Sequence, residues 1–397
     1  MKKRWASMLI LCAVILTGCN SGEDVLTESN VQEKQELTIW SYYETESQQR
    51  AMDQLVEEFN SAQDVYTIEW EYVPMTEFSK KLSMGYTENA LPDLVVMDNP
   101  DMPYYMKTGL LADITDMEGE LGIREDYYPK LLDTVYNDGK LYGVPLNCNN
   151  TALIYHTEIL EETGIIPPQD WESFEEAVQK LRTDQRYGFL MSAADGEQGA
   201  FQILPWILST GESIEEIGGE KTARAYDYLY RMIRSGGMDS NCINYSQIDV
   251  ARKFIQGETA MMQNGPWVLP MLDEAGISYG ITPLPVDNIQ CAVVGGENIG
   301  ILRGKNIEGA REFLKFVCQD NVMEQFCRKT GVLPTKKRLR DNVDIHQKVF
   351  LEQMDTAVVR TQNPRWNSLS PKLSQGIYAM LADGKTAEEV ADTLQEN

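Results

Sequence analysis

The chain has 397 residues, and its 61 acidic and 35 basic residues give a formal net charge of −26. This length is sufficient for two lobes that each have a hydrophobic core. The acidic residues are spread along the chain, and such a surface repels nucleic acid and anionic lipid headgroups, so neither is an expected partner.

The first 18 residues have the pattern of a secretory signal, with basic residues at 2–4 ahead of an apolar stretch at 8–16. That stretch is shorter than the roughly 20 residues of a membrane-spanning helix. The run LTGC at 16–19 resembles the lipobox of bacterial lipoproteins, whose cysteine is acylated and begins the mature chain. The alternative is an ordinary signal with an incidental Cys19. We expect a lipid anchor at Cys19 on the outer face of the cell membrane, or on its periplasmic side if the cell has an outer membrane.

The segment 19–36 is polar and acidic and has no aromatic residue, so we expect a flexible linker. Strands and helices then alternate, which predicts a parallel sheet with right-handed crossovers. The spacing of apolar residues predicts strands at 37–40, 66–73 and 94–97 and helices around 52–59, 78–82 and 104–107.

The middle of the chain is predicted to be mostly helical, and strands return before a helical last third. The predicted strands are 141–146, 279–281 and 293–302, and the predicted helices are 175–181, 223–233, 250–255, 310–327, 346–358 and 373–382.

Five cysteines follow Cys19, which leaves at least one of them unpaired within the chain. They are Cys148, Cys242, Cys291, Cys318 and Cys327. Buried free thiols are the simpler interpretation, and one disulfide between Cys318 and Cys327 is the alternative.

The usual signatures of catalysis are absent from the sequence. The only two histidines, His156 and His346, are far apart, and no HExxH, GxSxG or CxxC motif occurs. The run GKT at 384–386 has Ala379 where a phosphate-binding loop requires glycine. We therefore expect no enzymatic activity, no metal and no cofactor, although a carboxylate pair for glycoside hydrolysis stays open in so acidic a chain.

Aromatic and polar residues follow two of the predicted strands. In open α/β sheets, ligands bind beyond the carboxyl ends of the strands. Trp40, Tyr42 and Tyr43 follow the first strand, whereas Asp98 and Asn99 follow the third. These five residues are candidates for one binding site, with packing in the core as the alternative for each aromatic ring.

Further candidates lie in predicted turns and loops. Asn149 follows the strand that ends at 146, Gly296 and Glu297 form a turn, and Trp267 and Trp366 lie in loops. Aromatic rings stack on the C–H faces of sugars, while amides and carboxylates hold hydroxyl groups. The combination therefore favours a carbohydrate ligand.

Several motifs, in this order, resemble the extracellular solute-binding proteins, family 1, of ABC transporters, the group similar to maltose-binding protein. The match covers nearly the whole chain after Cys19. The motifs are LPDLV at 91–95, DGKLYGVP at 138–145, FIQGETAMM at 254–262, GPW at 265–267 and TGVLPT at 330–335.

The resemblance implies an α/β, two-lobed, periplasmic-binding-protein-like fold of type II. Each lobe is expected to be a mostly parallel sheet flanked by helices, with the ligand cleft between lobes. Segments near 146–151, 283–286 and 333–336 would cross between the lobes and allow hinge closure. The expected N-terminal lobe is 37–146 with 285–334, and the expected C-terminal lobe is 147–284 with 335–397.

The resemblance also implies which residues face the ligand. It brings Glu44 and Phe201 to the cleft beside the candidates above, and it makes Trp267 a ring that stacks on the ligand. Asn149 departs from the acidic residue often found there, which changes the hydroxyl pattern that is read, so maltose is not transferred as the ligand.

The implied function is that of a substrate-binding lipoprotein of an ABC importer. It would capture an extracellular mono- or oligosaccharide as a monomer and deliver it to the permease subunits. One alternative is a non-sugar ligand such as a polyamine, a peptide or a glycerol phosphate, and another is an exported glycan-active enzyme. A phosphate would need several basic residues, and only Arg365 is basic in the loops assigned to the cleft. Glu44, Asp98 and Glu297 beside aromatic rings keep a cationic ligand open.

Overall fold

The computed structural model describes residues 33–395. The predicted signal, Cys19 and nearly all of the predicted linker lie outside the described residues. Lys34–Asn397 forms one compact unit. Within the described range, no helix has the length and apolar character that crossing a membrane requires.

A five-stranded sheet is formed by strands from the N-terminal part of this unit together with one strand from much later in the chain. Its order is β2-β1-β3-β12-β6. The strands are β1 (Gln35–Ser41), β2 (Tyr66–Tyr72), β3 (Leu94–Asp98), β6 (Gly143–Pro145) and β12 (Glu297–Ile301). β1 is parallel to β2 and β3, as predicted, whereas β12 is antiparallel to β3 and β6. The register pairs Glu297 with Asp98.

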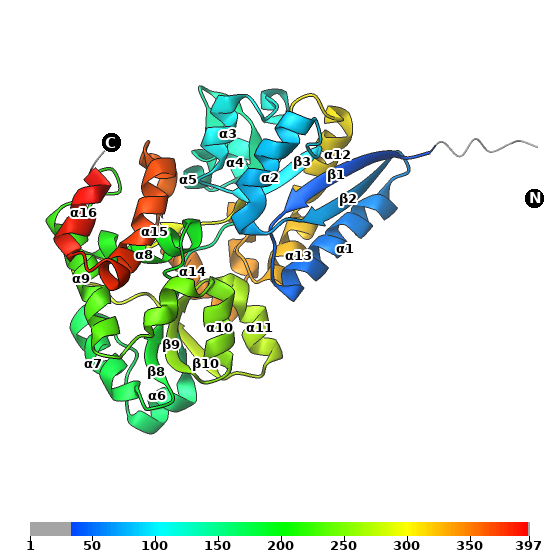
Figure 1. The fold of residues 1–397 in the computed structure, drawn as a ribbon. Helices are drawn as coiled ribbons and strands as arrows, with labels where there is room; N and C mark the ends of the chain where they lie inside the picture. The colour runs from blue at the N-terminus through cyan, green and yellow to red at the C-terminus, as the bar shows by residue number, and fades with distance from the viewer. Residues whose placement is uncertain (1–32, 396–397) are drawn as a thin grey trace, which may run out of the picture. The chain divides into compact units, whose positions relative to one another are not determined.

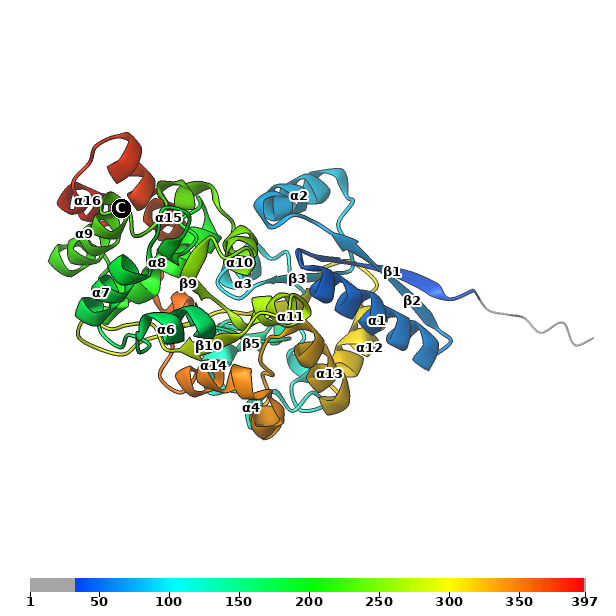
Figure 2. The ribbon, with the colours of Figure 1, turned by 90° about the horizontal axis from the view of Figure 1, so that it is seen from below.

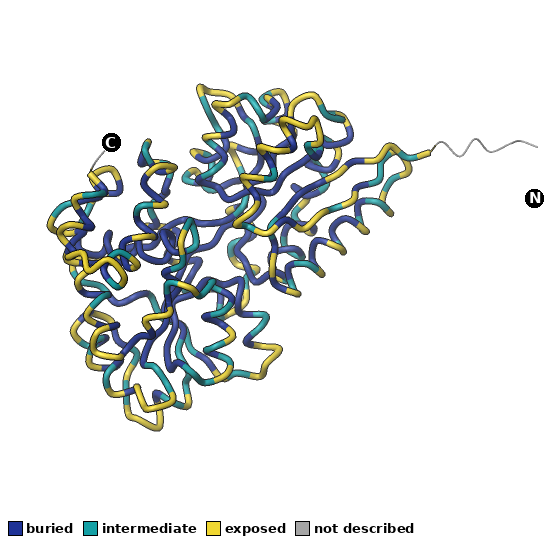
Figure 3. The backbone as a smooth tube through the Cα atoms, viewed as in Figure 1, coloured by how far each residue is buried: buried dark blue, intermediate teal, exposed yellow. Residues whose placement is uncertain are grey.

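Helices cover both faces of this sheet, which explains its continuous apolar strands. β3 reads LVVMD and is buried along its whole length, as expected for a strand between two helical layers. Figure 2 shows α2 (Met75–Glu88) on one side and α1 (Glu46–Ala62), α12 (Ile307–Val317) and α13 (Asp320–Thr330) on the other. Figure 3 shows buried chain in the centre of the sheet, whereas the edge strand β2 is mostly half-buried or exposed.

A second, four-stranded sheet has the order β10-β7-β9-β8. Its strands are β7 (Ala152–His156), β8 (Tyr187–Leu190), β9 (Thr259–Asn264) and β10 (Tyr279–Thr282). Neighbouring β8 and β9 are parallel, whereas β7 is antiparallel to both β9 and β10, so β8, β9 and β10 run in one direction and β7 runs in the other. The expected α/β fold with two sheets is confirmed.

The remaining helices flank the two sheets (Figure 1). They are α3 (Met102–Thr108), α4 (Ile123–Asp126), α5 (Pro129–Leu132), α6 (Thr157–Thr163), α7 (Trp171–Leu181), α8 (Glu197–Ser209), α9 (Glu220–Arg234), α10 (Gln247–Ile255), α11 (Leu269–Glu274), α14 (Lys348–Gln353), α15 (Trp366–Ala382) and α16 (Ala387–Gln395). Short 3₁₀ turns include η3 (Pro266–Val268) and η6 (Arg360–Gln362).

Three predicted elements are interrupted. The strand predicted at 293–302 is β11 (Val293–Val294) followed by β12, because Gly296 has a φ of 119° that no strand accommodates. The helix predicted at 310–327 is two helices, since Gln319 takes an extended backbone between them. The helix predicted at 346–358 ends after α14, and its last residues enter β13 (Val358–Val359), which pairs with β11. A smaller difference is the strand predicted at 141–146, which is β5 (Lys140–Leu141) and then β6, with β4 (Tyr136–Asn137) paired to β5.

Three segments far apart in sequence run side by side between the two sheets. Cys148 and Leu333 exchange backbone hydrogen bonds of 3.0 and 2.9 Å, and Asn149 and Gly295 exchange bonds of 3.1 and 2.8 Å. Val286, in the expected second crossing, is instead hydrogen-bonded to Gln169, next to α7. The segment that accompanies 148–149 and 333 is therefore 293–296 rather than 283–286.

The five described cysteines are all free and buried. This confirms the simpler interpretation of the thiols, and the disulfide considered between Cys318 and Cys327 is not formed.

Candidate functional site

A cavity of about 100 Å³, partly open to solvent, lies where residues from both sheets and their helices meet. Nine of the twelve predicted ligand residues line it, and eight other residues complete the lining. Together they are Tyr42, Tyr43, Glu44, Gln48, Met75, Asp98, Asn149, Glu197, Gln198, Phe201, Gln247, Ile248, Trp267, Gly295, Gly296, Glu297 and Arg360.

The lining residues come from the ends of elements. The loop 42–44 follows β1 and is held by the capping box of α1, in which Thr45 and Gln48 satisfy each other's backbone groups. Asp98 ends β3 and Glu297 begins β12, so their side chains emerge at the same edge of the five-stranded sheet. Glu197 and Phe201 lie on the first turns of α8, and Trp267 lies in η3, directly after β9.

Arg360 is the basic residue of this lining, and it bridges two acidic residues. Its guanidinium donates to both oxygens of Asp98, at 3.1 and 2.9 Å, and also donates to Glu197. The Arg360 side chain is only 2% exposed, and its Nε has no hydrogen-bond partner. Asp98 belongs to the five-stranded sheet and Glu197 to α8, so this cluster connects parts of both halves of the pocket.

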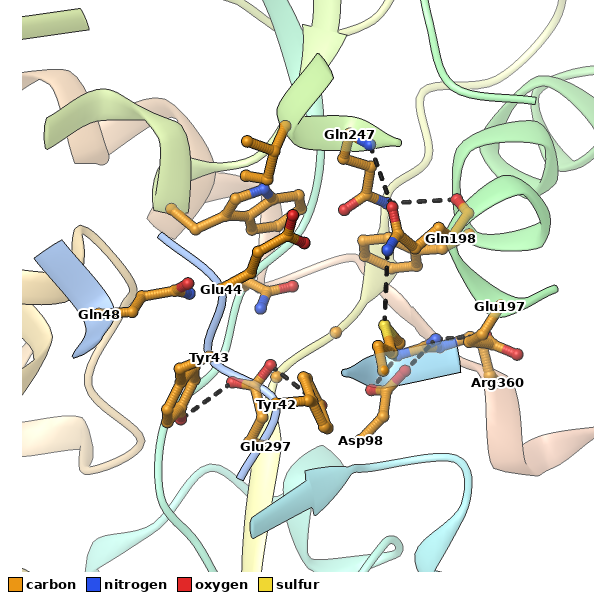
Figure 4. Close-up of a pocket in the computed structure, with 17 residues that line it drawn as sticks. Tyr42, Tyr43, Glu44, Gln48, Asp98, Glu197, Gln198, Gln247, Glu297 and Arg360 are labelled. Atoms are coloured by element: carbon orange, nitrogen blue, oxygen red, sulfur yellow. Dashed lines mark hydrogen bonds and ion pairs between the residues drawn. The ribbon is translucent and has the colours of Figure 1, made fainter. Parts of the chain in front are cut away.

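Glu297 lies between the rings of Tyr42 and Tyr43, as Figure 4 shows. The two phenol hydroxyls donate to its carboxylate over long distances of 3.3 and 3.5 Å. Burial, and secondly the charge of Asp98, raises the pKa of the Glu297 carboxyl to about 7. Burial and the nearby Glu297 also hold the phenol pKa values of Tyr42 and Tyr43 well above their usual range. The carboxyl group is therefore protonated in part at neutral pH, and both phenols stay hydrogen-bond donors.

Aromatic rings form the opposite wall of the pocket. The ring centroids of Phe201 and Trp267 are 6.3 Å apart, and the Arg360 guanidinium lies 4.6 Å from the Phe201 centroid. Gly265 makes room for Trp267, since a Cβ at this glycine would stand 1.8 Å from the indole ring. The close approach of the indole ring thus explains why the first residue of the GPW motif is glycine.

Two consecutive glycines in the pocket lining leave space that side chains would otherwise fill. A Cβ on Gly295 would lie 2.1 Å from Oδ1 of Asn149 and 2.7 Å from the Phe201 ring. A Cβ on Gly296 would lie 2.4 Å from the carbonyl oxygen of Asn147. Any side chain here would displace Asn149, Phe201 or the neighbouring backbone.

Three predicted site residues do not line the pocket. Trp40 packs against α2, with its ring 3.3 Å from where a Cβ on Gly85 would be and with Lys81 over its face. Asn99 is buried and accepts a hydrogen bond from Arg360. Trp366 is the first residue of α15 rather than a loop residue, and its indole N–H donates to Glu197 at 3.2 Å. Asn99 and Trp366 therefore hydrogen-bond to members of the Arg360 cluster without lining the pocket themselves.

The sequence analysis missed Arg360 and named Arg365 as the basic residue near the cleft, which the structure corrects. Arg365 does not line the pocket. The sequence offers one signal for Arg360, which is a basic residue directly after the apolar run 357–359. A basic residue next to such a run is expected to be buried and therefore to need acidic partners. The other missed lining residues lie on helices that were predicted too short or not predicted: Gln48, Met75, Glu197, Gln198, Gln247 and Ile248.

Comparisons with known proteins agree with this architecture. Residues 54–353 match the family model of bacterial extracellular solute-binding proteins. The diacetylchitobiose binding protein DasA of Streptomyces coelicolor is 25% identical over 303 residues, which cover 70% of this chain and 68% of DasA. The galactooligosaccharide-binding protein of Bacillus subtilis is 23% identical over 398 residues, which cover 93% of this chain and 88% of that protein.

A solved structure shows the same fold at low sequence identity. It is an ABC transporter solute binding protein from Thermotoga lettingae, bound with alpha-D-tagatose. The two chains superpose with a TM-score of 0.83 at 20% identity, covering 91% of this chain and 100% of the other. The two-sheet architecture and the family match, which extends over well more than half of the sequence, lead to one conclusion: this chain belongs to the bacterial extracellular solute-binding proteins.

Proposed function

We propose that this protein binds a mono- or oligosaccharide in the pocket between its two sheets and delivers it to the permease of an ABC importer. The observation that carries the proposal is the composition of the pocket. It combines the rings of Tyr42, Phe201 and Trp267 with the hydrogen-bonding groups of Asn149 and Glu297. Rings that stack on sugar faces and planar groups that hold hydroxyls are what a carbohydrate site needs.

The names of two relatives support the same ligand class. DasA is a diacetylchitobiose binding protein, and the Bacillus subtilis relative is a galactooligosaccharide-binding protein. Because Asn149 and the Arg360 cluster set the pattern of donors and acceptors here, the individual sugar is a property of this chain's own pocket.

Binding is proposed to close two lobes around the sugar. The proposed lobes are built on the five-stranded and the four-stranded sheet, and the proposed hinge contains the segments 147–149, 293–296 and 332–334, which run side by side. The proposed second crossing is thus later than the predicted boundary at 284–285, and the hydrogen bonds of Val286 to Gln169 and of Asn288 to Ser209 support this choice. The proposed action is capture and release without turnover.

The proposed location is the outer face of the cell membrane, where Cys19 carries a lipid anchor and the linker 19–36 tethers the folded unit. The LTGC run at 16–19 supports this proposal. Metabolic labelling with a fatty-acid analogue tests it, and Cys19→Ser should abolish the label.

A thermal-shift and tryptophan-fluorescence screen of Lys34–Asn397 against a panel of neutral and amino-bearing sugars tests the ligand class. A ligand at a hundredfold excess over its Kd stabilises the folded state by about 2.7 kcal/mol. We expect a saturable response to at least one sugar. Trp267→Ala should weaken it by about 2 kcal/mol or more, since buried aromatic contacts contribute this much to binding.

The control is Trp70→Phe, because Trp70 lies on β2, bonded to Asp53 and away from the pocket. This variant should keep the response. Silence toward every sugar, together with a response to a peptide or glycerol phosphate, would refute the carbohydrate proposal.

A further inference from the structure

The described pocket lining carries more negative than positive charge. One lining side chain is basic, Arg360, whereas four are acidic: Glu44, Asp98, Glu197 and Glu297. Asp98 and Glu197 are both engaged with Arg360, so this cluster already has one carboxylate in excess. Arg360 forms no ion pair with the other two acidic residues, and its charge lowers the pKa of Glu297 less than burial and Asp98 raise it.

Glu297 and Glu44 have no cationic partner among residues 33–395. Neither residue takes part in any ion pair of the described chain. Glu297 is the more buried of the two, and its partners are the neutral phenols of Tyr42 and Tyr43, which donate from 3.3 and 3.5 Å. A buried carboxylate without a cation is costly, and this carboxylate faces a cavity that a ligand can enter.

A neighbouring acid shows the same excess of negative charge. Asp101 follows β3 closely, and burial together with Asp98 and Glu197 raises the pKa of its carboxyl to about 8. Glu297 likewise retains its proton up to about pH 7. Both groups hold protons first because burial disfavours their charged forms, and secondly because nearby acids repel a further negative charge, which the single guanidinium of the pocket only partly offsets.

The rings of the pocket also suit a cation. The face of Phe201 is taken by Arg360, but within residues 33–395 no Lys or Arg lies over the rings of Tyr42, Tyr43 or Trp267. A desolvated cation beside an aromatic face is attracted by the negative face of the ring. Acidic side chains and rings that have no Lys or Arg over them thus line the same space, with the exposed Glu44 among them.

We propose that the preferred ligand is an amino sugar whose protonated primary amine contacts the carboxylate of Glu297, with Glu44 adding to the attraction at the rim. The inference rests on the proposed carbohydrate-binding function and specifies its ligand class. A neutral sugar supplies hydroxyl donors to the same carboxylate, but it brings no charge and leaves the excess of acidic groups unbalanced.

Matched sugars that differ only in the C2 substituent of each ring test this proposal by calorimetry on Lys34–Asn397 at slightly acidic pH. The probes are the β-1,4-linked dimers of glucosamine, N-acetylglucosamine and glucose, the pair galactosamine and galactose, and spermidine. We expect an aminated sugar to bind at least about tenfold more tightly than its hydroxyl and acetamide counterparts, as charge pairs across interfaces do.

Variants then locate the effect. Glu297→Gln should reduce the preference for the amine by about tenfold, and Glu44→Gln should reduce it less, because Glu44 is exposed and screened. Glu88→Gln is the matched control, since Glu88 is exposed on α2 and does not line the pocket. This control should leave the preference unchanged.

A second measurement uses the unaltered chain, so it does not depend on how the variants fold. A cation beside Glu297 favours its ionised form, so binding of an aminated sugar should release protons, and calorimetry in buffers of different ionisation enthalpy detects them. Proton release with the aminated sugar but not with its neutral counterpart supports the proposal.

The outcomes distinguish failure of the amine inference from failure of the proposed carbohydrate function. If neutral sugars bind as tightly as their aminated counterparts, or if an aminated sugar binds without proton release, the amine inference is overturned while carbohydrate binding stands. If spermidine alone binds, or no sugar of any kind does, the carbohydrate function is overturned and this inference falls with it.

Discussion

Glu297 is half-buried opposite Asp98 on a neighbouring strand, and this placement determines how the protein responds to pH. The groups that face its carboxyl include Asp98, Arg360, Tyr42 and Asn147, and the Tyr43 hydroxyl also donates to it. Asp98 opposes ionisation of Glu297, whereas Arg360, Tyr42 and Asn147 favour it to a smaller extent than burial opposes it. The result is a folded-state pKa of about 7, against an ordinary value of 4.5.

The sign of the effect on stability follows from which state binds more protons. Below pH 4.5 both states are protonated, and between 4.5 and about 7 only the folded state keeps the proton. The free energy of unfolding should therefore fall as the pH rises through this window and level off above it, by at most about 3 kcal/mol from this residue. Asp101 acts in the same direction, because its pKa is raised to about 8.

Urea unfolding at several pH values checks this prediction. Glu297→Gln should flatten the decline and should be more stable than the unaltered chain on the alkaline side of the window. A variant that keeps the full decline would show that another group holds the proton.

Single residues near strand ends could be predicted from the sequence because the argument is local. Asp98 and Glu297 each follow from the position of one strand and the rule that ligands gather at strand ends. Arg360 could not, since it meets Asp98 across 262 positions of sequence, and no local pattern reveals that contact. Trp40 was misplaced because its direction depends on which face of β1 meets α2.

At the level of elements, the two-residue break between β11 and β12 is required by the segment beside it. Gly296 has a φ of 119°, and a Cβ there would meet the backbone at Asn147. Gly304 also has a positive φ, of 80°, but nothing lies within 4 Å of its missing Cβ. Substitutions at these two glycines therefore separate the energetic cost of backbone strain from the cost of steric contact.

Gly296→Ala is expected to lower the free energy of unfolding clearly more than Gly304→Ala does. Both changes incur about 1–2 kcal/mol for a left-handed backbone, but only the first also forces apart the segments 147–149 and 293–296. Chemical denaturation of the two variants side by side measures the difference. Equal losses would mean that the segments move apart without cost.

The period of apolar residues located the strands of the five-stranded sheet and many helices, but it missed β7, β8, β9 and α8 and did not reveal where elements stop. The helix predicted at 310–327 keeps its apolar spacing through Gln319, although the backbone there is extended. Likewise, nothing in the alternation of 293–302 shows that Gly296 ends one ladder before the next begins. Such breaks depend on contacts with distant segments, which periodicity does not contain.

At the level of the whole molecule, Arg360 connects the two sheets. Its partner Asp98 ends a strand of the five-stranded sheet, while Glu197 begins α8, which is bonded to β9 of the four-stranded sheet through Gln263 and Gln202. Removing the guanidinium leaves two buried carboxylates facing each other without a counter-charge.

Arg360→Met should therefore lower the free energy of unfolding by about 3–5 kcal/mol. The matched control is Arg340→Met, because Arg340 forms an equally direct pair with Asp355 at 2.7 and 2.8 Å, but at the surface. That change should cost less than about 1 kcal/mol. Similar losses in both variants would remove the argument that the buried cluster is special.

Closure of the proposed lobes predicts that saturation with the sugar lowers the radius of gyration in solution scattering. The three adjacent segments at 147–149, 293–296 and 332–334 are the expected axis, since they are the strands of chain that run between the sheets. Unchanged scattering curves at saturating ligand would exclude a closing motion large enough to bury the sugar.

The buried thiols make such motions measurable without any label being engineered. Burial raises the pKa of all five cysteine thiols above the ordinary value, and only the thiolate reacts with alkylating reagents. Cys148 lies in the segment paired with Leu333, whereas Cys242 is buried within η2 (Ser240–Asn244). Comparing the alkylation rates of Cys148 and Cys242 therefore distinguishes two kinds of motion. Faster modification of Cys148 alone indicates opening of the proposed hinge, whereas equal rates indicate global unfolding.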